Sequence, residues 1–235
     1  MNSINDNNIT LIEETHKYIL KTMPDIKFQS VTTILDKFFE PFDEKKIAEK
    51  LCKTSPKYMG MRPEQLIASW HKLRDHGSNV HKEIELFLEN KTQPSELKAR
   101  LALNWLDRYC SRSDIEVFTE VIVYSSEIKV AGMVDILLYY KNDDTYEVID
   151  WKTTKEIKTA SFKNKMGIHP ISSDLMDCNF NHYALQLSMY RYLLETYYGL
   201  NIKNQMIAHL NDEMCKTYVT PYYDKKIYSI LSEIN

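Results

Sequence analysis

The chain has 235 residues, 43% of them hydrophobic and 27% charged, which is typical of a globular protein and excludes a disordered chain. Its 30 basic and 33 acidic side chains give a net charge of −3, so a nucleic-acid partner would need a local basic surface. No apolar run approaches the roughly 20 residues of a membrane span, and the polar start has no targeting character. We therefore expect an intracellular, cytoplasmic protein without a membrane partner.

The four cysteines lie far apart and form no C-x-x-C pair: Cys52, Cys110, Cys178 and Cys215. This spacing does not predict a zinc ribbon and gives no support for an iron–sulphur cluster. Free cysteines are among the most buried residue types. We expect reduced thiols in the core and no cluster.

The first 62 residues are predicted to form an N-terminal unit packed on a core of residues 63–235. The unit begins with a hairpin of 9–19 and 26–28, which turns at Met23-Pro24-Asp25 because proline and aspartate favour turns. An elaboration of a single domain is expected, since the length suits one domain.

Two helices should follow the hairpin. Ser30 is a candidate N-cap for a helix through Phe39, and Asp43 for a helix that ends at about Cys52. The segment Lys53–Arg62 then reads as a connecting loop, with a mobile lid as the alternative.

A long helix is predicted from Arg62-Pro63-Glu64 to about Glu89, because Pro63 suits a first turn and apolar residues recur at helical spacing. Gly77 in its interior costs about 1 kcal/mol relative to alanine, which predicts the close approach of another backbone. His81 lies one turn further on the same face. A lone helical histidine is usually an ordinary core or surface group, and the alternative is a neutral imidazole that faces a metal ion.

A second amphipathic helix is expected over 94–110, followed by strands at 115–124, 130–140 and 145–151. Three consecutive strands most simply form an antiparallel meander. Glu120 lies within the first strand, and a buried strand glutamate needs a partner or a metal ion.

Two carboxylates and a lysine stand at the ends of these strands. Asp135 follows Gly132, Asp150 closes the third strand, and Lys152 comes two residues later. Side chains two apart on a strand share a face, so Asp150 and Lys152 point the same way, with Asp135 beside Asp150 on the neighbouring strand. Such a group can hold a hard divalent cation and orient a water. The ordinary alternative is a solvated ladder pair.

The connection 153–180 is long, polar and without clear periodicity, which suggests a functional loop. Five lysines lie between Lys152 and Lys165 inclusive, among them Lys155 and Lys158, against one acidic residue. Lysine-rich loops are usually just solvated, but beside a metal site they can attract a phosphate backbone.

The next predicted helix, over 181–198, places Gln186 and Tyr190 four residues apart on one face. It is either an ordinary amphipathic helix or one that presents an amide and a phenol to a phosphate or base. The remaining expected elements are strands at 202–210 and 217–220 and a helix at 222–234.

The order of these elements, with four motifs, resembles the PD-(D/E)XK nuclease superfamily and within it the RecB-type exonuclease branch. The motifs are Gly77-x-x-x-His81, Gly132-x-x-Asp135, Asp150-x-Lys152 and Gln186-x-x-x-Tyr190. The N-terminal part, with His16-x-Tyr18, is similar to the lead-in of phage, viral and mitochondrial genome maintenance exonucleases. The resemblance implies an α/β fold with a restriction-endonuclease-like core, in which helices flank a central mixed sheet.

The resemblance also implies roles for individual residues. Mg²⁺ or Mn²⁺ would be held by His81, Asp135, Asp150 and the Trp151 carbonyl, with a secondary metal or water role for Glu120. Lys152 would orient or deprotonate the attacking water. Gln186 and Tyr190 would contact the DNA near the scissile phosphate. From its charge rather than from the resemblance, the basic loop with Lys155 and Lys158 is expected to bind substrate. The absence of the family's four-cysteine pattern fits the cluster-free members.

The resemblance therefore implies a metal-dependent DNA exonuclease that acts on ends, with single-stranded DNA as the leading substrate. Because a buried carboxylate pair without metal has one raised pKa, activity is expected to rise toward alkaline pH. Three alternatives stay open: a structure-selective or flap endonuclease on the same core, an inactive nucleic-acid-binding module, and a structural α/β domain with coincidental motifs.

Overall fold

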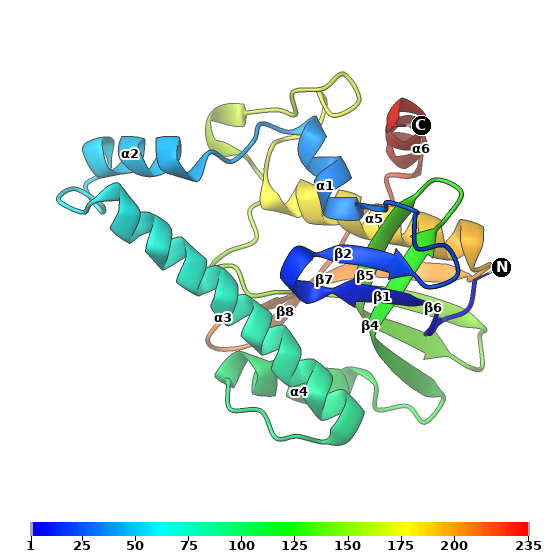
Figure 1. The fold of residues 1–235 in the computed structure, drawn as a ribbon. Helices are drawn as coiled ribbons and strands as arrows, with labels where there is room; N and C mark the ends of the chain where they lie inside the picture. Colours follow the sequence, from blue (N-terminus) through cyan, green and yellow to red (C-terminus); the bar gives the residue numbers. More distant parts are fainter. Residues whose placement is uncertain (1, 235) are drawn as a thin grey trace.

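The computed structural model describes residues 2–234, and a six-stranded mixed sheet forms its centre (Figure 1). The strands of this sheet are β3 (Gln29–Ser30), β4 (Ile115–Ser125), β5 (Val130–Tyr140), β6 (Thr145–Lys152), β7 (Ile202–Leu210) and β8 (Cys215–Val219). The helices are α1 (Val31–Leu35), α2 (Glu44–Thr54), α3 (Pro63–Asn90), α4 (Leu97–Tyr109), α5 (Asn179–Tyr197) and α6 (Asp224–Ile234).

The predicted meander is confirmed, because β4, β5 and β6 pair antiparallel in sequence order. Strand β7 then joins β6 in parallel after the crossover through α5, and β8 pairs antiparallel with β7. The short β3 pairs in parallel with the start of β5. Parallel and antiparallel pairs in one sheet with flanking helices confirm the α/β class and the mixed sheet.

Helices cover both faces of the sheet. On one face α1, α5 and α6 contribute to a core with buried residues such as Leu187 and Val148. On the other face α3 and α4 pack on buried residues such as Ile149 and Trp151. Consecutive residues of β6 thus enter different cores, as strand alternation requires. Each fully buried large apolar side chain contributes about 1.5–3 kcal/mol to folding.

The N-terminal hairpin consists of β1 (Ile9–Ile12) and β2 (Lys17–Leu20), with the short 3₁₀ helix Glu13–Thr15 at its turn. A turn forms at Met23-Pro24-Asp25, where the Ile26 N–H donates to the Met23 carbonyl at 3.2 Å, but the prediction that the hairpin reverses there was wrong. The chain reverses at His16, which adopts a left-handed conformation at φ 50°. Histidine enters this region more often than most residues, but its presence alone does not predict the turn.

Both predicted N-caps are confirmed. Ser30 Oγ accepts a hydrogen bond from the Thr33 N–H at 3.1 Å, and Asp43 Oδ1 accepts one from the Lys46 N–H at 3.0 Å. The helix after Ser30 is shorter than predicted, because α1 gives way to a 3₁₀ turn at Asp36–Phe38.

The long helix α3 carries α2 at its N-terminal end, and the two project from the body as a helical arm (Figure 1). Gly77 lies further along α3, where it faces the sheet. A Cβ at this position would stand 2.6 Å from Thr153 Oγ1, so the close neighbour is a side chain, not the backbone that we predicted. No described helix is long and apolar enough to cross a membrane.

Candidate active site

The candidate site lies where the ladder between β5 and β6 ends. The last regular pair joins Ile136 to Ile149, and the next residues along the two strands are Asp135 and Asp150. Here Asp135 Oδ2 instead accepts a hydrogen bond from the Trp151 N–H at 2.7 Å. The two carboxylates are therefore neighbours on adjacent strands, which is the placement expected from the sequence.

Glu120 enters the site through an unusual backbone conformation. Its neighbours Thr119 and Val121 pair with β5, but Glu120 itself stands at φ 50° within the strand. For a residue other than glycine, this left-handed conformation costs on the order of 1–3 kcal/mol and is frequent at functional sites. The inward alternation changes here, because Val117 packs on the α4 side and Val121 on the α5 side, although both are odd-numbered.

His81 comes from α3, which crosses this part of the sheet at Gly77. Its Nδ1 lies 3.5 Å from Asp135 Oδ2. One potential ligand atom from each of His81, Glu120 and Asp135 lies within 4.8 Å of the other two. An imidazole and two carboxylates from three separate elements therefore converge as a possible cation site.

Asp150 and Lys152 form an ion pair next to this cluster, with Asp150 Oδ2 and Lys152 Nζ 2.5 Å apart. The Lys152 ammonium also lies over the Tyr183 ring, 4.5 Å from its centroid. Asp150 thus faces its lysine in this structure and is not a member of the three-residue cluster. The predicted roles of Asp150 and of the Trp151 carbonyl as metal ligands stay predictions.

Gln186 connects this ion pair to the interior of α5. Its Nε2 donates to Asp150 Oδ1 at 3.3 Å and to the Tyr190 hydroxyl at 2.9 Å, while its Oε1 accepts from Lys152 Nζ at 3.4 Å. Gln186 is 9% exposed and Tyr190 only 4%. Their polar groups bond to one another and to the ion pair, and both residues line a cavity of about 210 Å³. The prediction that both contact DNA stays a prediction.

Charges of both signs balance in the enclosed site. Burial opposes protonation of His81, but Asp135 raises its pKa above the usual value. Burial likewise opposes the charge on Lys152, yet Asp150 and Asp135 raise its pKa. Burial would raise the pKa of Asp135, but His81, Lys152 and the Trp151 N–H hold it below the usual range. Two cations therefore compensate the carboxylates in the protein alone.

The remaining carboxyl groups hold protons more tightly than usual. Burial raises the pKa of Asp150 to about 6, with Lys152 limiting the rise. Burial and the negative charge of Asp135 raise the pKa of Glu120 to about 9. Glu120 is thus protonated at neutral pH, and a cation that binds it must displace the proton.

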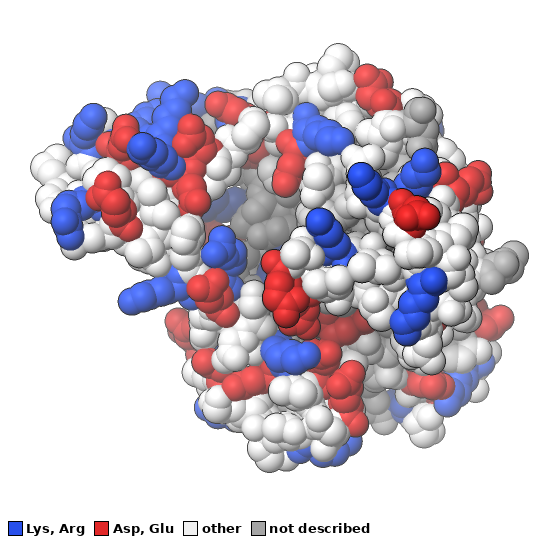
Figure 2. Space-filling model, in the orientation of Figure 1, with Lys and Arg blue, Asp and Glu red and all other residues white. Residues whose placement is uncertain are grey.

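Cavities open on both sides of His81, which lines two of them. The first has a volume of about 680 Å³ and includes Glu120 and Asp135 in its wall. The second has a volume of about 770 Å³. Its residues with a fixed charge are Arg74, Lys98, Lys152, Lys155 and Asp212. Figure 2 shows the molecule hollowed between the helical arm and the body.

The two lysines predicted to bind substrate are placed differently. Lys155 lines the second cavity, which is called the basic cavity below because most of its fixed charges are cationic. Lys158 is exposed on the loop beyond it and lines neither cavity beside His81, and its backbone N–H donates to Asn179 Oδ1 at 2.7 Å.

Sequence reasoning missed other residues around Lys152. Tyr183 precedes Gln186 by three residues on α5, and that helical spacing was the available signal. Arg74 and Lys98 come from different helices and carry no local signal.

Comparison with known proteins gives little further information. No protein-family model matches the sequence, and no curated protein matches it either. Among solved structures, one titled "Crystal structure of SSO0001" is similar over 88% of this chain and 74% of its own, at 14% identity and a TM-score of 0.39. A likeness at this level supports no inference about function, so the functional argument depends on the residues themselves.

Proposed function

We propose that this protein is a metal-dependent DNA exonuclease with a PD-(D/E)XK-type, restriction-endonuclease-like core. The observation that carries the proposal is the convergence of the His81–Glu120–Asp135 cluster with the Asp150–Lys152 ion pair where the β5–β6 ladder ends. Carboxylates and an imidazole can hold a metal ion that activates a water, and a lysine beside them can stabilise negative charge on the phosphate, which suits hydrolysis of a phosphodiester.

The donor set fits a divalent cation. Two carboxylates favour Mg²⁺ or Mn²⁺, and the imidazole shifts the preference toward Mn²⁺. The raised pKa of Glu120, caused by burial and by Asp135, shows that the site holds more carboxylate than it can leave ionised. A bound ion would neutralise that charge, polarise a phosphate oxygen and lower the pKa of a bound water.

Lys152 would act as a cation in this reaction. Asp150 and Asp135 outweigh burial and raise the pKa of its ammonium, so it stays protonated at neutral pH. A charged lysine can orient a water and stabilise negative charge on the phosphate, and of the two roles expected from the sequence these conditions favour that one over proton abstraction. Gln186 holds Asp150 and Lys152 in place, which makes it a positioning residue.

The basic cavity supports a nucleic-acid substrate. Four cationic side chains and one carboxylate line it, and His81 lines both this cavity and the one that holds Glu120 and Asp135. A row of cations attracts a phosphate backbone in any sequence context. Single-stranded DNA ends are the substrate that the family resemblance favours.

The test is digestion of end-labelled single-stranded DNA, linear against circular, with Mn²⁺, Mg²⁺ or EDTA. We expect linear DNA to be degraded only with metal and the circle to survive. Lys152→Ala should lose activity by at least about 100-fold, while Lys158→Ala, which removes the same charge outside both cavities beside His81, should stay within about threefold. Cleavage of the circle would favour the endonuclease alternative, and no digestion with any metal would leave the binding-module alternative.

A further inference from the structure

The two cavities beside His81 differ in charge. On the Lys152 side, four cations and one carboxylate line the wall. On the other side, the residues with a fixed charge, apart from the proposed metal ligands, are Glu13, Asp75, Lys82 and Glu85. Several of these groups are paired, Lys82 with Glu85 at 2.7 Å, Asp75 with Arg74 at 3.4 Å and Lys98 with Asp212 at 3.5 Å. The predominant fixed charge is thus positive in one cavity and negative in the other, and the His81–Glu120–Asp135 cluster lies between them. The two cavities together are called the substrate groove below.

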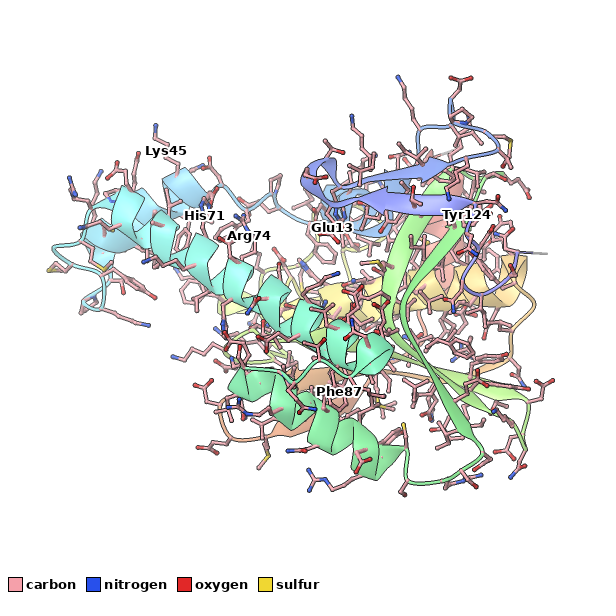
Figure 3. The ribbon with its side chains drawn as sticks, turned by 60° about the horizontal axis from the view of Figure 1, so that its bottom comes forward. Glu13, Lys45, His71, Arg74, Phe87 and Tyr124 are labelled. Atoms are coloured by element: carbon pink, nitrogen blue, oxygen red, sulfur yellow. The ribbon has the colours of Figure 1, made fainter. Side chains whose placement is uncertain are left out.

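The β1–β2 hairpin forms one wall of the first cavity, which is called the acidic cavity below because carboxylates predominate among its fixed charges. Leu11, Glu13 and His16 line it from the hairpin, opposite residues of α3. Figure 3 shows Glu13 at the hairpin turn on the side of α3, with Arg74 further along that helix toward the arm. The hydrogen bond that Lys82 donates to Glu85 is the largest cause of the raised pKa of Lys82, and the charge of Glu13 also contributes, so Glu13 acts across the cavity.

This wall is fixed to the body. Ile9, Tyr18 and Leu20 are buried in the same core as α5, and the Tyr124 hydroxyl donates to Asp6 Oδ2 at 2.6 Å just before β1. Beyond His16 lies a small cavity of about 210 Å³, while past Glu120 a cavity of about 660 Å³ continues along the hairpin. Apart from Glu120, the fixed charges of this larger cavity are Asp6, Glu13, Glu85 and Glu89 against Lys21. A strand that passes the His81–Glu120–Asp135 cluster therefore enters a space that stays open but is lined mainly by carboxylates.

We propose that the carboxylates on the hairpin side of the substrate groove, among them Glu13 and Asp75, oppose entry of the substrate strand, so that only one or a few terminal nucleotides pass the scissile position. This inference rests on the proposed nuclease function and specifies its end dependence. Each nucleotide beyond the scissile phosphate adds a negative charge that faces carboxylates, whereas the rest of the strand faces cations. A circle has no short end to place there.

The chain offers a matched pair of variants for the test. Glu13 and Glu14 are exposed neighbours in the hairpin turn, but only Glu13 lines the acidic cavity. Glu13→Lys and Glu14→Lys change the net charge equally. Linear single-stranded DNA labelled at either end and circular DNA are digested with Mn²⁺ at low salt, because screening at 0.1 M weakens exposed charges beyond about 10 Å.

We expect the wild type and Glu14→Lys to release products of one to about three nucleotides. Glu13→Lys should raise the fraction of longer products at least about threefold and cut the circle at least about tenfold faster than the wild type. Asp75→Lys, on the facing helix, should shift product length in the same direction.

Unchanged products and unchanged resistance of the circle in both Glu13→Lys and Asp75→Lys, with melting temperatures near that of the wild type, overturn the inference. So does an equal shift in Glu14→Lys, because overall charge would then explain it. Failure of the proposed function looks different, since the wild type itself would not digest linear DNA with any metal.

Discussion

The side-chain amide of Gln186 donates a hydrogen bond of 2.9 Å to the hydroxyl of Tyr190, one turn further along α5. The same nitrogen reaches the carboxylate of Asp150 at 3.3 Å. Tyr190, which is 4% exposed, therefore acts on the ion pair of the site through Gln186.

Tyr190→Phe removes this hydroxyl and keeps the ring. A lost hydrogen bond of about 1 kcal/mol predicts a kcat about fivefold lower at unchanged KM, because the variant disturbs positioning rather than binding. Steady-state kinetics on linear DNA measure both constants, with Tyr228→Phe on α6 as control. A raised KM at unchanged kcat would instead support the direct contact between Tyr190 and DNA that was expected from the sequence.

Gly132 is the position that accommodates the Tyr190 ring. A Cβ on Gly132 would overlap Tyr190 Cε1 and lie 3.1 Å from Val31 Cγ2. Overpacking of this kind predicts that Gly132→Ala lowers the free energy of unfolding by about 1–3 kcal/mol. Denaturant unfolding measures the change. In a Tyr190→Ala background the same substitution should cost much less, and an equal cost in both backgrounds would show that the ring is not the cause.

Glu120 makes the metal-free protein less stable as pH rises. Its folded-state pKa of about 9, raised by burial and Asp135, exceeds the ordinary 4.5, so only the unfolded chain ionises it between these values. We expect the contribution of the protonated Glu120 to the free energy of unfolding to be fully present below pH 4.5 and to be lost progressively up to about pH 9. Glu120→Gln should then raise the free energy of unfolding at pH 8 by more than about 1 kcal/mol, the equivalent of one pKa unit.

The comparison uses Glu116→Gln, an exposed carboxyl on the same strand, which should have little effect. Mn²⁺ should stabilise the wild type and Glu116→Gln but not Glu120→Gln. Equal stabilisation of all three would place the ion elsewhere.

Metal binding should release protons. At pH 7 both Glu120 and part of His81 are protonated, since burial and Asp135 raise the pKa of Glu120, and Asp135 outweighs burial to raise that of His81. We expect about one to two protons per bound Mn²⁺ and an affinity that rises with pH toward 9. Calorimetry in buffers of different ionisation enthalpy counts them, and an enthalpy independent of buffer would contradict this assignment.

Strand alternation and capping residues predicted much of the fold. They placed Asp135 beside Asp150 and Lys152 on the face of Asp150, and they identified Ser30 and Asp43 as N-caps. These features depend on spacing within a strand or a helix, which the order of residues contains directly.

Features that depend on tertiary contacts were not predictable in the same way. The left-handed conformation of His16 sets the hairpin turn, and that of Glu120 directs its carboxyl group into the site. Neither conformation can be predicted from the residue type alone. The basic cavity draws Arg74 and Lys98 from separate helices. The burial of Gln186 and Tyr190 follows from how α5 packs, not from their spacing.

The central claim is that the cluster around Asp135 performs metal-dependent hydrolysis. Asp135→Asn tests it most directly, because the amide oxygen can still accept from the Trp151 N–H while the negative charge is removed. With saturating Mn²⁺, we predict that this variant folds as the wild type does but degrades linear single-stranded DNA at least about 100-fold more slowly. A folded Asp135→Asn protein that degrades the strand at the wild-type rate would contradict the claim.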